Sequence, residues 1–159
     1  MSMIQNILCP TDFSATAMRA VTYAEQLARE LNANLYLVHA FDTPVTLTLE
    51  GQEHPRDPSL ETKLQALLAD SPHKDRIHRY QHAGVPGEVI CWFAQDHKCD
   101  LIVMSTHGRT GLKHVLFGSV AEYVFQHARC PVVTVRDRDP NEPPLVRPSV
   151  TPALAPRYM

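Results

Sequence analysis

Two kinds of hydrophobic pattern alternate along the chain. Short apolar or alternating runs, some ending in proline or followed by glycine, are typical of β-strands. They occupy Ile4–Pro10, Asn34–Phe41, Arg76–Ala83, Asp100–Met104 and Pro131–Val135. The run at Asp100–Met104 is almost entirely apolar, which predicts a central parallel strand buried on both faces, whereas the polar Arg76–Ala83 predicts an edge strand.

Between these runs, apolar residues recur at spacings of three and four, which predicts amphipathic helices. The predicted helices cover Ala17–Leu31, Ser59–Ala69, Glu88–His97 and Gly118–His127. Ser14 or Asp12 is a candidate N-cap for the first helix, and Asn32 is a candidate end. Residues 43–58 contain three prolines and a glycine, which predicts a long loop.

The order of elements is β-α-β-loop-α-β-α-β-α-β, which predicts an α/β fold. We expect a single doubly wound domain with a five-stranded parallel sheet and helices on both faces, because consecutive parallel strands need helical crossovers. We assign residues 1–136 to this domain. Residues 137–159 contain six prolines and lack apolar periodicity, which predicts a flexible tail. The tail could bind a protein partner that the sequence does not identify.

Composition narrows the class of protein. The 159 residues are 44% hydrophobic and carry a net charge of −2, which disfavours a protein that binds the nucleic-acid backbone. No apolar run reaches 18 residues, so no membrane span is predicted, and the N-terminus lacks the pattern of a signal peptide. We therefore expect a cytoplasmic protein. Its four cysteines have no CxxC spacing, which favours small buried hydrophobic residues over a metal or redox pair.

Candidate chemistry lies in the loops after the strands, because open α/β sheets bind ligands at the carboxyl ends of their strands. Gly108, nine residues and then Gly118-Ser119 precede the last helix. Glycines allow close backbone approach, and a helix N-terminus attracts anions. Arg109, Lys113 and His114 add donors. This predicts a phosphate-bearing ligand; in the alternative interpretation the glycines only form turns and Ser119 only caps the helix.

Asp12 ends the first strand, where a carboxylate can accept hydrogen bonds from a ribose, bind a metal or cap the following helix. These roles stay open at this point. The fingerprints of P-loop proteins, Rossmann dinucleotide-binding proteins and α/β-hydrolases are absent from the sequence. His78 and His82 share one face of a predicted strand, and we interpret them as part of a polar edge rather than as metal ligands.

Four segments together resemble the universal stress protein family, in its nucleotide-binding branch. The family pattern is Gly, two residues, Gly, nine residues, then Gly-Ser or Gly-Thr. Ser105-Thr106-His107-Gly108 with Gly118-Ser119 matches all of it except the first glycine. Pro10-Thr11-Asp12-Phe13-Ser14, Leu37-Val38-His39-Ala40 and Cys130-Pro131-Val132-Val133 also resemble family segments. The resemblance covers residues 3 to 136 and implies the same five-stranded α/β fold.

The resemblance implies binding of ATP, AMP or a related adenine nucleotide, with Mg²⁺ carried by the nucleotide if it is needed. It places two groups of residues around such a ligand. Near the base and ribose these are Pro10, Thr11, Asp12, the Ala40 backbone, Met104 and Ser105; around the phosphates they are Gly108, Arg109, Gly118, Ser119 and Val120. No catalytic residue and no protein-bound metal are assigned.

Ser105 departs from the family pattern, which has glycine at this position. If that glycine adopts a positive φ, a serine is strained or the loop shifts, and nucleotide binding weakens. If the glycine only provides room, a serine is tolerated or adds a hydrogen bond. Both outcomes stay open in the sequence.

The resemblance also implies a homodimer, because the family commonly dimerises through its fifth strand. Val132, Val133 and Val135 form the apolar strand that would pair.

Three functions follow as hypotheses. The first is a stress-response protein that binds ATP or AMP and acts by conformational signalling or partner docking. The second is a slow Mg²⁺-dependent ATP hydrolase that uses Asp12. The third is a dimeric adaptor that has lost its nucleotide.

Overall fold

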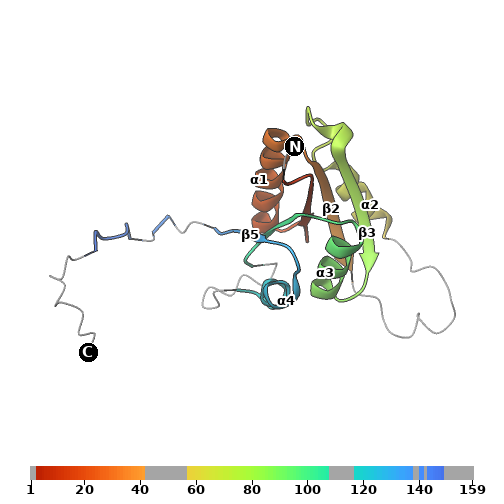
Figure 1. Ribbon diagram of the computed structural model, residues 1–159. Coiled ribbons are helices and arrows are strands. Elements are labelled where there is room, and N and C mark those ends of the chain that lie inside the picture. Colours follow the sequence, from red (N-terminus) through yellow and green to blue (C-terminus); the bar gives the residue numbers. More distant parts are fainter. Residues whose placement is uncertain (1–2, 42–56, 108–116, 138–139, 142, 149–159) are drawn as a thin grey trace.

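Strands and helices alternate along the chain in the predicted order (Figure 1). The computed structural model describes residues 3–41, 57–107, 117–137, 140–141 and 143–148. The strands are β1 (Asn6–Pro10), β2 (Asn34–Phe41), β3 (Ile77–Ala83), β4 (Leu101–Ser105) and β5 (Val132–Val135). The helices are α1 (Ala15–Leu31), α2 (Pro58–Ala66), the short 3₁₀ helix η2 (Lys74–Arg76), α3 (Pro86–Asp96) and α4 (Ser119–His127).

The strands form one parallel sheet with the order β3-β2-β1-β4-β5. The predicted fold class is confirmed, and β3 lies at an edge of the sheet as its polar pattern predicted. The direction of winding reverses between β1 and β4, where chain connections leave toward opposite sides. In doubly wound folds this is the point at which ligands bind, outside the carboxyl ends of the strands.

Alternate residues of each central strand pack on opposite faces of the sheet. In β1, Ile7 and Cys9 belong to one core cluster with α1, whereas Leu8 belongs to a second cluster with α3 and α4. In β4, Val103 faces the first cluster and Ile102 the second. Both faces of the sheet are therefore buried at these strands, which explains why the strands are near-continuous apolar runs.

The first helix has the boundaries that its caps dictate. Ser14 Oγ accepts a hydrogen bond from the Ala17 amide at 3.2 Å, and Asn32 ends the helix in the left-handed region at φ 53°. Between them, small buried residues on one face let α1 lie close to the sheet. The choice between Ser14 and Asp12 is thereby settled: Ser14 is the cap, while Asp12 Oδ1 accepts from the Ser14 amide at 2.9 Å.

The second helix is shorter than predicted. The apolar spacing continues through Leu67 and Leu68, but α2 ends at Ala66. Leu67 is extended, and Leu68 has φ 57°. The guanidinium of Arg79 on β3 donates to the Leu67 carbonyl at 2.6 and 3.1 Å, which satisfies this end of the helix.

The cysteines behave as the sequence predicted at two positions. Cys9 and Cys99 are buried among core side chains, and burial raises the pKa of the Cys99 thiol to about 12. Burial raises the pKa of Cys9 as well, so neither thiol ionises near neutral pH.

After β5, Asp137 contacts Arg19 of α1 at 2.8 Å, and residues 140–141 and 143–148 form neither helix nor strand. Among the described residues, no helix is both long and apolar enough to cross a membrane.

Candidate functional site

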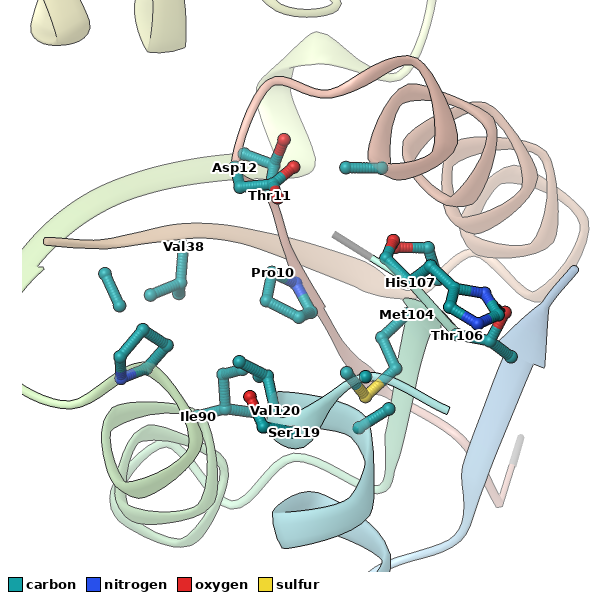
Figure 2. A pocket seen from close by; sticks show the side chains of 16 residues that line it. Pro10, Thr11, Asp12, Val38, Ile90, Met104, Thr106, His107, Ser119 and Val120 are labelled. Atoms are coloured by element: carbon teal, nitrogen blue, oxygen red, sulfur yellow. Dashed lines mark hydrogen bonds between the residues drawn. The ribbon is translucent and has the colours of Figure 1, made fainter. Parts of the chain in front are cut away.

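A pocket of about 270 Å³ opens at the carboxyl ends of β1, β2 and β4 (Figure 2). It is lined by every sequence-predicted site residue that the structure describes, namely Pro10, Thr11, Asp12, Ala40, Met104, Ser105, Gly118, Ser119 and Val120. Gly108, Arg109, Lys113 and His114 lie outside the described residues. The structure therefore brings together residues from three separate strand ends and one helix N-terminus.

The loop after β1 is tied at several of its polar atoms. The Thr11 amide donates to the Val38 carbonyl at 2.9 Å, and Thr11 Oγ1 accepts from the Phe13 amide at 3.1 Å. Phe13 has φ 63°, an uncommon conformation for a bulky residue, which these bonds and its packing against the core compensate. This loop positions Thr11 and Asp12 at the edge of the pocket.

The buried side chain of His39 on β2 contacts the same loop. His39 is 6% exposed, its Nδ1 lies 2.8 Å from the Thr11 carbonyl oxygen, and its ring packs against Phe13 with 4.9 Å between ring centres. Because a carbonyl can only accept, Nδ1 carries the proton and donates. His39 was noted in the sequence only as part of a family segment, and its contact with Thr11 is a tertiary feature.

Replacing His39 with leucine is expected to cost about 1–3 kcal/mol of unfolding free energy, because the buried Thr11 carbonyl loses its donor. Denaturant unfolding measures this loss. His127→Leu is the matched control, since His127 Nδ1 also contacts a backbone carbonyl, that of Tyr123 at 2.9 Å, but on the exposed surface. Its expected cost is within about 0.5 kcal/mol. Equal unfolding midpoints for the two variants would contradict the role given to His39.

The conformation of Ser105 at the end of β4 shows whether a serine is strained at this position. Ser105 is the last residue of the strand, pairs with Val135 of β5, and does not have a positive φ. The backbone of Ser105 is therefore not in the strained left-handed region. The Ser105 hydroxyl donates to the His107 carbonyl at 3.0 Å. His107 and Thr106 also line the pocket.

The N-terminus of α4 faces the pocket, and its N-cap residue makes no side-chain hydrogen bond to the helix. Gly118 is the N-cap residue, with φ −69° and ψ 164°, and Ser119 is the first helical residue. The alternative in which Ser119 only caps the helix is thus corrected. The Gly118 amide donates to the Thr106 carbonyl at 2.8 Å. The following turn offers backbone N–H groups and the positive end of the helix dipole, which favour an anion.

One wall of the pocket was missed by the sequence analysis. Pro86 and Ile90 come from the first turns of α3, which follows β3 and its turn. The rule that points to strand ends could have found them, but it was applied only after β1, β2 and β4. Helices α3 and α4 approach closely here: a Cβ on Gly87 would lie 2.7 Å from the Tyr123 ring. A glycine at this position lets the two walls meet.

The histidines of the edge strand have aromatic partners. His78 stacks on Tyr36 with ring centres 5.0 Å apart, and His82 lies 4.9 Å from the Trp92 ring centre. Within the described residues, no group of three or more His, Cys, Asp or Glu side chains could hold a metal ion. These contacts give His78 and His82 a packing role on the α3 side of the sheet.

The opposite edge of the sheet is β5. Val133 and Val135 pack partly against the α1 cluster and Val132 against the α3–α4 cluster, so these side chains cover the faces of the sheet. The Ile102 amide donates to the Pro131 carbonyl, and Ile102 pairs with Val132. In a parallel ladder this leaves the N–H and C=O groups of Val132 and Thr134 directed away from β4. Among the described residues no strand pairs with this side of β5, so this free edge is a row of backbone groups.

Comparisons with known proteins agree with one another. The sequence profile described as the universal stress protein family matches residues 3–136. Universal stress protein MJ0531 of Methanocaldococcus jannaschii is 35% identical over 142 residues, which cover 85% of this chain and 84% of the relative.

Solved structures show the same fold. The structure of protein MJ0577, a universal stress protein from the same organism, aligns with a TM-score of 0.71 and 27% identity, covering 86% of this chain and 99% of the other. The universal stress protein from Archaeoglobus fulgidus in complex with dAMP aligns with a TM-score of 0.55 and 22% identity, covering 84% and 98%. At that identity the likeness shows the fold alone.

Proposed function

The chain belongs to the universal stress protein family, and from this premise we propose that its pocket binds an adenine nucleotide, ATP or AMP. The observation that carries the proposal is the convergence of the nine predicted residues on one cavity at the point where the winding of the sheet reverses. A volume of about 270 Å³ lies just below the usual range for small-molecule pockets, which favours one mononucleotide over a dinucleotide.

The walls divide into an apolar part and a polar part. Val38, Ala40, Pro86 and Ile90 provide an apolar surface for a flat base. Thr11 and Asp12 present a hydroxyl and a carboxylate on the opposite side of Pro10 from Ile90 (Figure 2). A carboxylate accepts hydrogen bonds from the hydroxyls of a ribose, so we place the sugar near Asp12.

The phosphates belong at the N-terminus of α4. Gly118, Ser119 and Val120 line the pocket there, and the N-cap residue Gly118 has no side chain that could compete for the first amides of the helix. A phosphate can accept several of these N–H groups at once while the helix dipole stabilises its charge. Arg109 remains a predicted further contact. The dAMP complex of the Archaeoglobus protein supports the proposal because a nucleotide of this class occurs in a protein of the same fold.

The two alternatives make different demands. An adaptor that has lost its ligand was favoured by Ser105, but Ser105 is unstrained and its neighbours still line a cavity. A slow hydrolase would need Mg²⁺ held near the phosphates, for which Asp12 is the candidate acid. Its activity would vanish in Asp12→Ala. We propose binding coupled to conformational signalling or partner docking as the function; cytoplasmic action stays a prediction.

The test begins with protein purified without added nucleotide. After denaturation, mass spectrometry of the released small molecules is expected to find ATP, ADP or AMP. If none co-purifies, the protein is titrated with AMP and with ATP plus Mg²⁺ by calorimetry, and saturable binding is expected. Absence of both signals would refute the nucleotide site. Recovery of ATP rather than ADP would argue against fast hydrolysis.

We further propose that two copies associate through their β5 edges, as the family resemblance predicts. The outward backbone groups of Val132 and Thr134 are the donors and acceptors that a second strand would use. Antiparallel pairing would satisfy them and would remove an exposed edge. The proposal concerns the backbone, because the valine side chains already pack on the faces of the sheet.

A further inference from the structure

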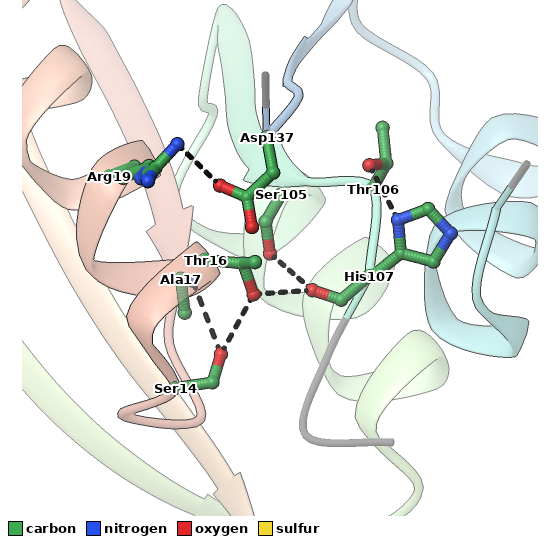
Figure 3. A network of polar contacts seen from close by, with 8 residues as sticks. All are labelled: Ser14, Thr16, Ala17, Arg19, Ser105, Thr106, His107 and Asp137. Carbon is green, nitrogen blue, oxygen red and sulfur yellow. Dashed lines mark hydrogen bonds and ion pairs between the residues drawn. The ribbon is translucent and has the colours of Figure 1, made fainter. Parts of the chain in front are cut away.

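Hydroxyl groups link the first turn of α1 to the residues that follow β4 (Figure 3). Ser105 Oγ donates to the His107 carbonyl oxygen at 3.0 Å, and Thr16 Oγ1 donates to the same oxygen at 2.9 Å. A carbonyl oxygen has two lone pairs, so these two donors saturate it. Thr16 and His107 are 91 positions apart, and their contact joins the first turn of α1 to the residues that follow β4.

The direction of each bond follows from the protons available. Thr16 has one hydroxyl proton and gives it to His107, so it accepts in its 3.1 Å contact with Ser14. Ser14 Oγ therefore donates to Thr16 while it accepts from the Ala17 amide at 3.2 Å. The cap of α1 and the His107 carbonyl are the two ends of one series, in which each bond polarises the next.

Hydrogen bonds also join the two ends of the segment between β4 and α4. We call the residues at these ends, Thr106, His107 and Gly118, the neck. The Gly118 amide donates to the Thr106 carbonyl at 2.8 Å, so the segment enters and leaves the pocket at one place. Thr106 is 5% exposed, and its hydroxyl lies 3.0 Å from His107 Nδ1. All three residues of the neck line the pocket beside the N-terminus of α4.

We propose that Ser105 and Thr16, the hydroxyl pair, are positioning residues of this pocket. Their two hydrogen bonds fix the His107 carbonyl and occupy its lone pairs, which shields an anionic ligand from the partial negative charge of that oxygen. The neck is thereby held in the shape that presents the N-terminus of α4 to the pocket. This inference rests on the proposed function. It gives Ser105 a role that a glycine cannot have, because glycine has no hydroxyl.

The first test measures AMP affinity by calorimetry in Ser105→Gly, Thr16→Val and the double variant. Each single change removes one donor and is expected to weaken binding about three- to tenfold. The double change leaves the carbonyl without either hydroxyl, so its loss should exceed the product of the two single losses. Thr16→Ser, unlike Thr16→Val, retains the hydroxyl and should bind AMP with wild-type affinity. Thr22→Val is the control, because Thr22 donates to a backbone carbonyl of the same helix at 3.0 Å on the exposed surface.

The second test uses the ligand-free protein and measures amide hydrogen exchange of Gly118 by NMR. The double variant is expected to exchange at least tenfold faster than wild type, and Thr22→Val at the wild-type rate. Unchanged exchange in the double variant, or AMP binding by Ser105→Gly as tight as wild type, would overturn the inference. If wild-type protein bound no nucleotide, the proposed function would fail by itself, and the exchange rates would still decide whether the hydroxyl pair holds the neck.

Discussion

Replacing Ser119 with aspartate is expected to weaken AMP and ATP binding at least 100-fold. Ser119 is the first residue of α4 and lines the pocket at the N-terminus of the helix. A carboxylate there competes for the helix N–H groups and repels a phosphate. Charged hydrogen bonds of this kind contribute about 1.5–3 kcal/mol each, and about 2.7 kcal/mol corresponds to 100-fold in affinity.

The same substitution should leave the fold intact, which makes the result easy to interpret. An acidic residue in the first turn of a helix stabilises it by about 0.3–1 kcal/mol, so thermal unfolding should occur at the same or a slightly higher temperature. Gln126→Glu adds the same charge on an exposed position of α4 and serves as the control. It should leave nucleotide affinity unchanged.

Adenosine separates the phosphate contact from the rest of the site. Because it carries no phosphate, its affinity should change by less than about threefold in Ser119→Asp while AMP affinity collapses. Calorimetry or equilibrium dialysis with both ligands provides the comparison. If AMP affinity were retained, the phosphates would not lie at the α4 N-terminus. If adenosine affinity fell equally, the substitution would have changed the pocket as a whole.

The elements with strong local signals were predictable from the sequence. β2 was predicted with both of its boundaries because an apolar run follows directly on Asn32, whose left-handed conformation ends α1. α2 was overestimated because Leu67 and Leu68 continue the helical spacing. The end of α2 instead depends on Arg79, which donates to the Leu67 carbonyl from a strand 12 positions away. Hydrophobic period contains no information on such a contact.

Many residues of the site were predictable from the sequence, but the tertiary contacts that hold them in place were not. The family resemblance and the strand-end rule identified nine of the residues that line the pocket, but they missed Pro86 and Ile90. The sequence could not decide between a strained and a tolerated Ser105, because that depends on its pairing with Val135 in a neighbouring strand. In the same way, the bonds of His39 to Thr11 and of Thr16 to His107 join residues 28 and 91 positions apart. Nothing in a local pattern specifies which hydroxyl or imidazole meets which carbonyl.

Thr134→Pro is expected to convert a dimer of twice 17.9 kDa into a monomer. The amide of Thr134 points away from β4, so proline removes a donor at the free edge and leaves the bonds between β4 and β5 in place. Sedimentation at micromolar concentration, where wild type should be dimeric, measures the change. Circular dichroism should show the same helix and strand content in both proteins.

A matched substitution distinguishes the backbone from the side chain at this edge. Thr134→Val removes the hydroxyl but keeps the N–H and a β-branched side chain, so it should remain dimeric. If both variants were monomeric, the threonine side chain rather than the strand backbone would hold the two copies together. If both stayed dimeric, or if wild type sedimented at 17.9 kDa, pairing through β5 would be wrong. The outcome matters for signalling, because β5 pairs with β4 at Ser105, and a second copy on β5 would lie one strand from the hydroxyl pair and the pocket.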